Sequence, residues 1–330
     1  MKKLGTFLLS SMLLLMNSCS ETSSPGLEWL GDEVAVRFIT TMNPSVEILP
    51  LTRAESMIEG GTLPAGETVG IYGIRTQTVE ELHNTTWEVA TFHRQMKNKQ
   101  YLVEENHTLS PANGEVDYHP MGDSLLTVCA YMPYSEDVTA DGYLPVDLSK
   151  QTDILYTGIQ TVQDKTQAIA LPFKHALGAV AFRFYTEDKS LVGMKIRSIT
   201  LNTNYSSEGV KVNVADGTFQ TEGNSGICPI DLSGNAIRSA EESADVLEAV
   251  GHTMLPAGRN CLITGLALNY GESEVASTVL ETPVELTAGK VSVLRIKCNL
   301  QNTSVLQLAT RTTIAADTEV TFTLEKITTE

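Results

Sequence analysis

The sequence predicts an all-β protein that is built as two β-sandwich domains behind an export signal. Short apolar segments with an alternating pattern recur along the chain, and turn pairs such as Asn113-Gly114 and Asp216-Gly217 stand between them. A length of 330 residues suits two domains of about 100–200 residues each. Hydrophobic residues make up 42% of the chain and charged residues 19%, as is typical of globular proteins. The short alternating segments with turn pairs between them favour antiparallel sheets.

Residues 1–18 have the pattern of a lipoprotein signal peptide. Lys2 and Lys3 precede an apolar stretch at 7–16, which is shorter than the roughly 20 residues of a transmembrane helix. Cys19 follows at the cleavage position of a bacterial lipobox, and the sequence departs from the clearest form of that motif at Asn17. We expect Cys19 to carry the lipid and residues 19–32 to form a polar tether. The alternative is an ordinary secretory signal with an incidental cysteine.

The first strand after the tether is predicted at residues 33–38, where Val34, Val36 and Phe38 alternate with smaller or charged residues. This period of two indicates a strand with one buried face. The segment at 237–250 is predicted as a short helix or a loop. The other predicted strands are residues 69–74, 124–132, 176–186, 195–203, 210–219, 260–270, 277–286, 290–300 and 318–328.

A domain boundary is predicted after the polar stretch at 160–167, because a new apolar series begins at Ala168. The chain would then consist of an N-terminal sandwich at 33–167 and a C-terminal sandwich at 168–330. Each would be long enough to bury a core of its own.

The composition excludes several classes of function. The formal net charge of −17 argues against nucleic acid as a partner. The six histidines are scattered, and the cysteines form no CxxC pair, so we expect no metal site, no cofactor and no catalytic constellation. Cysteines inside apolar strand patterns behave as small core residues. The pairing of Cys129, Cys228, Cys261 and Cys298 stays open.

Several segments together resemble the Bacteroidetes fimbrillin family, the FimA-like subunits of type V pili. They are "LPAGETVGIYGI" at 63–74, "VCAYMPYS" at 128–135, "LPFKHALGAVAFRF" at 171–184 with "IRSITLNT" at 196–203, and "ELTAGKVSVLRIKCNL" at 285–300. Their order behind a lipoprotein signal carries the resemblance, which covers nearly the whole mature chain.

The resemblance implies two transthyretin-like Greek-key sandwiches, export as an outer-membrane lipoprotein, assembly with other pilus subunits into a surface fimbria, and a contribution of that fimbria to adhesion. It also implies that an arginine-specific protease cleaves the chain and frees the first strand, and that a strand of a neighbouring subunit fills the groove. Carried onto this sequence, the cleaved bond is Arg53-Ala54. Arg37 and Arg75 are other basic residues nearby.

The C-terminal segment at 319–324 has the same alternation as residues 33–38. Val320, Phe322 and Leu324 would share one face, so this segment is the candidate donor strand. The alternatives are that both segments are simply edge strands, or that the protein is a surface lipoprotein that binds glycan and never polymerises. Aromatic residues make up only 6% of the chain, which counts against a dedicated glycan binder.

Overall fold

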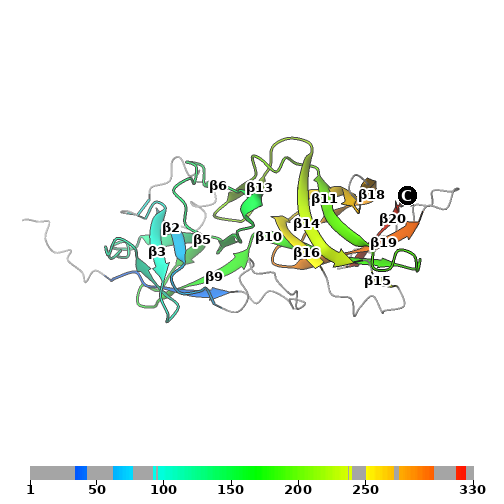
Figure 1. The fold of residues 1–330 in the computed structure, drawn as a ribbon. Coiled ribbons are helices and arrows are strands. Elements are labelled where there is room, and N and C mark those ends of the chain that lie inside the picture. Colours follow the sequence, from blue (N-terminus) through cyan, green and yellow to red (C-terminus); the bar gives the residue numbers. More distant parts are fainter. Residues whose placement is uncertain are drawn as a thin grey trace, which may run out of the picture. The chain divides into compact units, whose positions relative to one another are not determined.

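The computed structural model describes residues 34–42, 62–76, 92–93, 96–236, 238–239, 250–270, 275–300 and 317–324. This part of the chain is all-β, as predicted (Figure 1), and its one helical element is a 3₁₀ turn at Leu148–Lys150. Most of the segment predicted as a helix or loop lies outside the described residues, although β15 (Arg238–Ser239) falls within it. No helix in the described part is long and apolar enough to cross a membrane.

An eight-stranded sheet contains most of the strands before residue 176. Its order is β2-β3-β4-β1-β9-β7-β5-β8, and a further pairing of β2 with β5 closes the path into a ring that leaves only β8 outside. The strands are β1 (Phe38–Met42), β2 (Thr68–Thr76), β3 (Lys99–Val103), β4 (Thr108–Pro111), β5 (Leu125–Met132), β7 (Leu155–Tyr156), β8 (Gln160–Val162) and β9 (Ile169–His175).

The apolar face of these strands forms one hydrophobic cluster. In β9 the burial alternates, with Ile169, Leu171 and Phe173 buried, because successive side chains of a strand point to opposite faces. Phe38 and Met42 of β1 belong to the same cluster. The first strand therefore contributes to the core.

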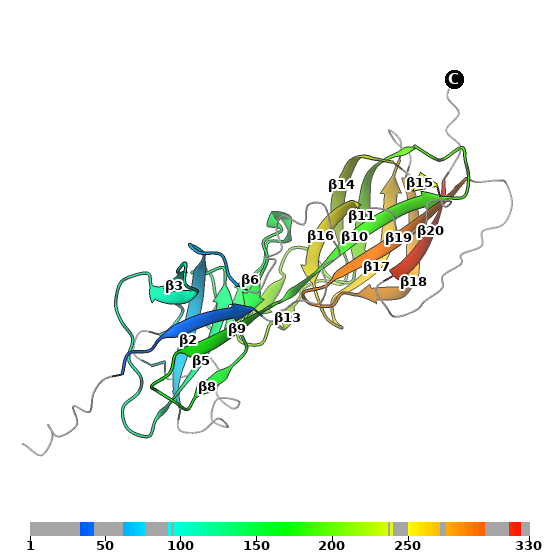
Figure 2. The same ribbon diagram turned by 90° about the horizontal axis from the view of Figure 1, so that it is seen from below.

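The later strands form a sandwich of two sheets. A five-stranded sheet has the order β15-β10-β19-β20, with β16 paired to β10, and a four-stranded sheet has the order β14-β11-β17-β18. Figure 2 shows β10, β19 and β20 side by side. The strands are β10 (Leu177–Thr186), β11 (Lys195–Thr203), β14 (Gly226–Ala236), β16 (Val250–Pro256), β17 (Leu262–Asn269), β18 (Val275–Glu285), β19 (Val291–Leu300) and β20 (Asp317–Leu324).

Buried side chains from both sheets of the sandwich belong to a single hydrophobic cluster, which is the packing expected between two β-sheets. A small three-stranded sheet completes the fold, with β6 (Tyr143–Pro145), β12 (Lys211–Asn213) and β13 (Phe219–Gln220). The predicted turn at Asp216-Gly217 lies between β12 and β13, and Gly217 has φ +73°, a conformation that glycine adopts readily.

The prediction of antiparallel sheets is wrong for four strand pairs. β1 runs parallel to β9, β10 runs parallel to both β15 and β19, and β19 runs parallel to β20. Turn pairs in the sequence mark hairpins between consecutive strands, whereas parallel partners are joined by longer connections that carry no such signal. The Greek-key connectivity and the boundary between residues 167 and 168 stay predictions.

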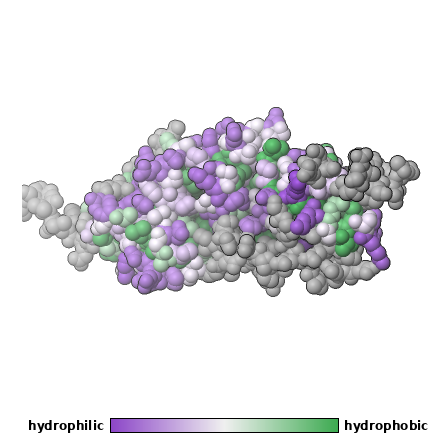
Figure 3. Space-filling view, in the orientation of Figure 1, coloured by the Kyte–Doolittle hydropathy of each residue, from purple (hydrophilic) through white to green (hydrophobic). Residues whose placement is uncertain are grey.

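The described surface is mixed in polarity. On the face drawn in Figure 3, hydrophilic and intermediate residues cover most of the described surface, and hydrophobic residues gather only in small groups. Such a surface suits a protein with a net charge of −17, because like charge opposes non-specific association.

Candidate functional site around the first strand

The first strand, β1, is an internal strand of the eight-stranded sheet. It pairs antiparallel with β4 on one side and parallel with β9 on the other. The register sets Phe38 opposite Leu109 and Ile169, and Met42 opposite Phe173. In Figure 2 the strand, drawn in blue, lies along β9. Removing β1 would leave a groove with exposed hydrogen-bonding edges on both sides.

The strand predicted at 33–38 begins later in the structure, at Phe38. Residues 34–36 run beside residues 117–119 and form only an isolated bridge, between Ala35 and Tyr118. Val36 N donates to Asp117 O at 2.7 Å, and His119 N donates to Val34 O at 2.9 Å. The segment is hydrogen-bonded, but its neighbour is a connecting loop and not a long strand.

Burial along the first strand keeps the predicted alternation but shifts it toward the C-terminus. Val34 is 36% exposed, Val36 packs against the cluster, and Phe38 is only 1% exposed. Thr40 and Met42 continue the buried face. Thr40 is tied to the loop before β4, because its N and its Oγ1 both donate to His107 O, at 2.9 and 3.2 Å.

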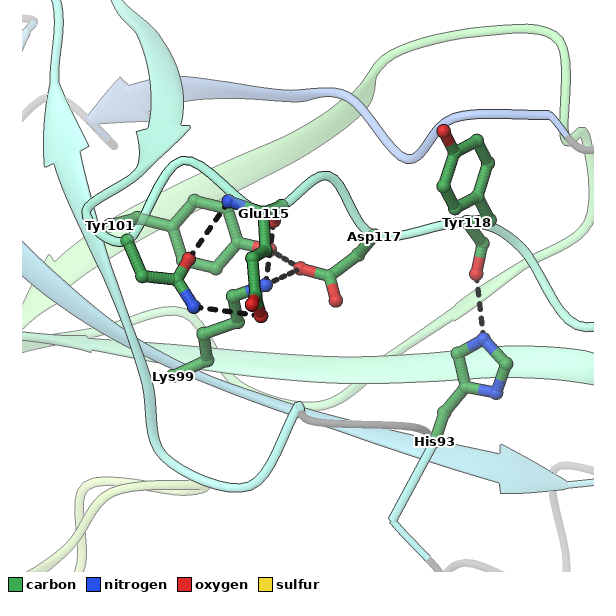
Figure 4. A network of polar contacts seen from close by, with 7 residues as sticks. His93, Lys99, Tyr101, Glu115, Asp117 and Tyr118 are labelled. Atoms are coloured by element: carbon green, nitrogen blue, oxygen red, sulfur yellow. Dashed lines mark hydrogen bonds and ion pairs between the residues drawn. The ribbon is translucent and has the colours of Figure 1, made fainter.

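Phe38 contacts a buried polar network. Its ring meets the Tyr101 ring edge-on, with centroids 5.4 Å apart. Figure 4 shows the Tyr101 hydroxyl and the Lys99 ammonium both reaching the carboxylate of Asp117. The distance from Lys99 Nζ to Asp117 Oδ2 is 2.8 Å, and the two side chains are 6% and 4% exposed. Lys99 Nζ also donates to Glu115 O.

This network satisfies charges that would otherwise be costly to bury. Burial raises the pKa of the Tyr101 hydroxyl, and its hydrogen bond to Asp117 raises it further. The phenol therefore stays a hydrogen-bond donor at neutral pH. Asp117 connects the network to the N-terminal segment, because its backbone carbonyl accepts from Val36.

The other flank of the first strand is held by the loop before β9. Arg37 Nη2 donates to Thr166 O at 2.6 Å, and Ile169 N donates to Arg37 O at 2.7 Å. In the same loop, Lys165 Nζ donates to Pro120 O and to Gly122 O, at 2.7 Å each. The loop therefore links the start of β1 to the segment around His119.

The candidate donor strand lies within β20, on the edge of the five-stranded sheet. β20 pairs parallel with β19 and is the last strand in that sheet's order. The register places Val320 opposite Ile296, Phe322 opposite Cys298 and Leu324 opposite Leu300. Within the described chain, β20 thus has one hydrogen-bonded partner strand, and its other edge pairs with no strand.

Three of the predicted site residues, Cys19, Arg53 and Ala54, lie outside the described residues. The other two arginines considered for cleavage lie in hydrogen-bonded segments. Arg37 leads directly into β1, and Arg75 is in β2, where it pairs with Leu126 of β5. Proteases need extended and accessible backbone, so neither arginine is a good substrate in the folded chain.

The described cysteines form no disulfide: Cys129, Cys228, Cys261 and Cys298 are free thiols. The described part of the chain also brings together no group of three or more His, Cys, Asp or Glu side chains suited to a metal ion.

The residues that surround β1 were not predicted from the sequence. One signal was present, because alternation in β3 places Lys99 on the same buried face as Tyr101 and Val103. A lysine at an inward position suggests a buried partner. Nothing in the sequence identifies that partner as Asp117.

Comparisons with known proteins agree with this architecture. A family described as fimbrillin-like matches residues 52–319. Fim1C of Bacteroides uniformis, a candidate fimbrium subunit, is 26% identical over 162 residues, which are 47% of this chain and 50% of the relative. The chain therefore spans about half the length of this curated relative.

Solved structures show the same fold at low identity. A candidate cell adhesion protein from Bacteroides uniformis has a TM-score of 0.52 and 17% identity, over 80% of this chain and 95% of that one. A second, from Bacteroides ovatus, has a TM-score of 0.51 and 14% identity, over 80% of this chain and 92% of that one. At such identities the likeness concerns the fold alone.

Proposed function

The chain belongs to the fimbrillin-like family, whose members are structural proteins without enzymatic activity, and we propose that it is a subunit of a surface fimbria that assembles by strand exchange. In this proposal the precursor is exported as an outer-membrane lipoprotein through Cys19. An arginine-specific protease cleaves Arg53-Ala54 and releases the first strand. Val320, Phe322 and Leu324 of a neighbouring subunit then fill the groove.

The observation that supports the proposal best is the position of β1 between β4 and β9. A strand at a sheet edge would leave no groove when it departs, whereas an internal strand leaves two unpaired edges. An incoming strand that pairs with both edges satisfies the same backbone groups that β1 satisfies now. This is recognition by strand addition.

The energetics support replacement of β1 by another strand and not its loss alone. Burying Phe38 and Met42 stabilises the fold by about 1.5–3 kcal/mol each, and whole domains are stable by about 5–15 kcal/mol. Losing β1 would also expose the network of Lys99, Tyr101 and Asp117 to water. A cleaved subunit would therefore be marginally stable until another strand enters.

The parallel partner sets the direction of the incoming strand. It must run parallel to β9 and present an apolar side chain where Phe38 meets Tyr101. The sequence Val320-Thr321-Phe322 repeats the spacing of Val36-Arg37-Phe38, so Phe322 is the residue that we assign to the Phe38 position.

The test is cleavage of the purified precursor with an arginine-specific protease. We expect a new N-terminus at Ala54, followed by a ladder of polymers on a denaturing gel and by filaments in electron micrographs. Arg53→Gln should block both the cleavage and the polymerisation. Arg75→Gln is the matched control and should block neither. A product that begins elsewhere contradicts the assigned site. Cleavage at Ala54 that leaves a stable monomer contradicts strand exchange.

A further inference from the structure

A buried histidine lies where the N-terminal segment docks. His119 is 4% exposed, and neither of its ring nitrogens has a hydrogen-bond partner among the described residues. Its backbone N donates to Val34 O at 2.9 Å. The ring therefore occupies an enclosed site next to a backbone contact that holds the start of the first strand.

Positive or protonatable groups contact the backbone on both sides of His119, and another contacts the loop that carries one of them. Lys165, in the loop before β9, donates from its ammonium to the carbonyl of Pro120, the residue after His119. His93 Nε2 lies 2.6 Å from the carbonyl of Tyr118, the residue before it (Figure 4). Arg37 reaches the carbonyl of Thr166, beside Lys165.

The acidic groups of the same region are engaged elsewhere. The Asp117 carboxylate accepts from Lys99 and from Tyr101. The Asp164 carboxylate accepts from the N and the Oγ1 of Thr166. No ion pair to His119 is found among the described residues, so a proton on its ring would add positive charge beside Lys165.

We propose that His119 is an acid-sensitive switch: uptake of a proton by its ring weakens the docking of residues 34–36 on residues 117–119 and so loosens the first strand. The inference rests on the proposed function for its purpose, because a strand that is exchanged must first be released. The docking itself is a property of the intact chain and is measurable without cleavage or assembly.

The direction of the effect follows from proton linkage. Burial lowers the pKa of His119, and the nearby Lys165 and His93 lower it further. The unfolded or undocked ring titrates near the usual value of about 6.5. The undocked state therefore binds more protons below that pH, and docking is fully stable above about pH 6.5 and weakens as the pH falls through it.

Amide hydrogen exchange in the full-length, uncleaved chain tests the proposal. The reporter is the amide of Val36, which donates to Asp117 O, with rates corrected for the intrinsic effect of pH. Between about pH 7.5 and about pH 5.5, the opening equilibrium should rise by up to about tenfold in total, the limit for one group whose undocked pKa is about 6.5. The His119→Phe variant should lose this dependence.

A second histidine provides a matched control. His107 is exposed, and its carbonyl accepts from Thr40 of the same first strand. Because His107 has φ +63°, His107→Asn is the replacement that suits its backbone. This variant should keep the full pH dependence. If His119→Phe folds poorly, Lys165→Met tests the same charge pair, and it should reduce the change in opening.

Opening that is independent of pH in the natural chain overturns the proposal. So does an unchanged pH dependence in both His119→Phe and Lys165→Met, which would assign the titration to another group. Failure of strand exchange after cleavage would overturn the proposed function but not this switch. Acid-sensitive docking in a chain that never polymerises would support the switch and contradict the proposed function.

Discussion

Lys99 Nζ lies 2.8 Å from Asp117 Oδ2, and both side chains are almost completely buried. The pair connects the start of β3 to the segment that docks residues 34–36, since the carbonyl of Asp117 accepts from Val36. Tyr101 donates to the same carboxylate and contacts Phe38. The stability of the first strand is therefore coupled to one buried ion pair.

Breaking this ion pair should destabilise the protein strongly. The Asp117→Ala change leaves the Lys99 charge buried without its partner, which costs about 3–5 kcal/mol. Urea denaturation followed by circular dichroism measures the loss. The surface pair of Lys211 and Glu222, 3.4 Å apart and partly exposed, is the matched control: Glu222→Ala should cost about 0–1 kcal/mol. Equal losses in the two variants would contradict the coupling.

Truncating the aromatic residue of the first strand should also be costly. Phe38→Ala opens a cavity against Tyr101 and Leu109 and should lower the free energy of unfolding by about 3–5 kcal/mol. Thr41, in the same strand, is exposed, so Thr41→Ala should change it by no more than about 0.5 kcal/mol. A small effect of Phe38→Ala would show that β1 adds little to the core.

Local patterns predicted many of the strands but not β3, β4, β9, β14 or β16, and they gave no information on long-range contacts. Alternation of apolar residues placed the strands near β2, β5, β10 and β17, because burial on one face leaves a period of two in the sequence. The same rule placed the first strand at 33–38, a few residues early, since it cannot tell a strand from a segment paired with a loop.

The parallel neighbours of β1 and β10 had no local signal, because pairing between distant segments depends on the whole fold. The same holds for the site. The inward position of Lys99 was not predicted and is known from the structure, and nothing in the sequence identifies Asp117, whose role depends on a loop that returns beside β3.

The buried thiols should react slowly with alkylating reagents in the folded protein. Burial raises the pKa of Cys129 and of Cys298 to about 12 and that of Cys261 to about 11, and the thiolate is the reactive form. At about pH 8, near the ordinary thiol pKa, mass spectrometry should detect little modification of these three residues before unfolding and full modification in urea. The half-buried Cys228 is the internal reference and should react first. Rapid labelling of Cys298 in the folded state would contradict its burial.

The raised thiol pKa values also predict a loss of stability in base. The unfolded thiols give up their protons near their ordinary pKa of about 8.5, whereas the folded ones hold them to higher pH. Stability contributed by Cys129 is therefore complete below about pH 8.5 and is lost as the pH rises toward its folded pKa of about 12. Thermal unfolding as a function of pH measures this, and Cys129→Ala should flatten the decline. A decline of the same slope in that variant would assign it to other groups, such as the buried tyrosines.

The proposed donor strand makes the sharpest prediction about assembly. Neighbouring residues of a strand face opposite sides, so Phe322 and Thr321 should face opposite sides of the incoming strand. Phe322→Asp would bring a charge to the apolar slot beside Tyr101 and should abolish the ladder of polymers after cleavage, because an unpaired buried charge is too costly. Thr321→Asp carries the same charge in the same strand on the other face, and it should still polymerise. Circular dichroism of both uncleaved variants checks that they fold. If the two variants assemble equally, the groove does not select the face that carries Phe322, and another segment must fill it.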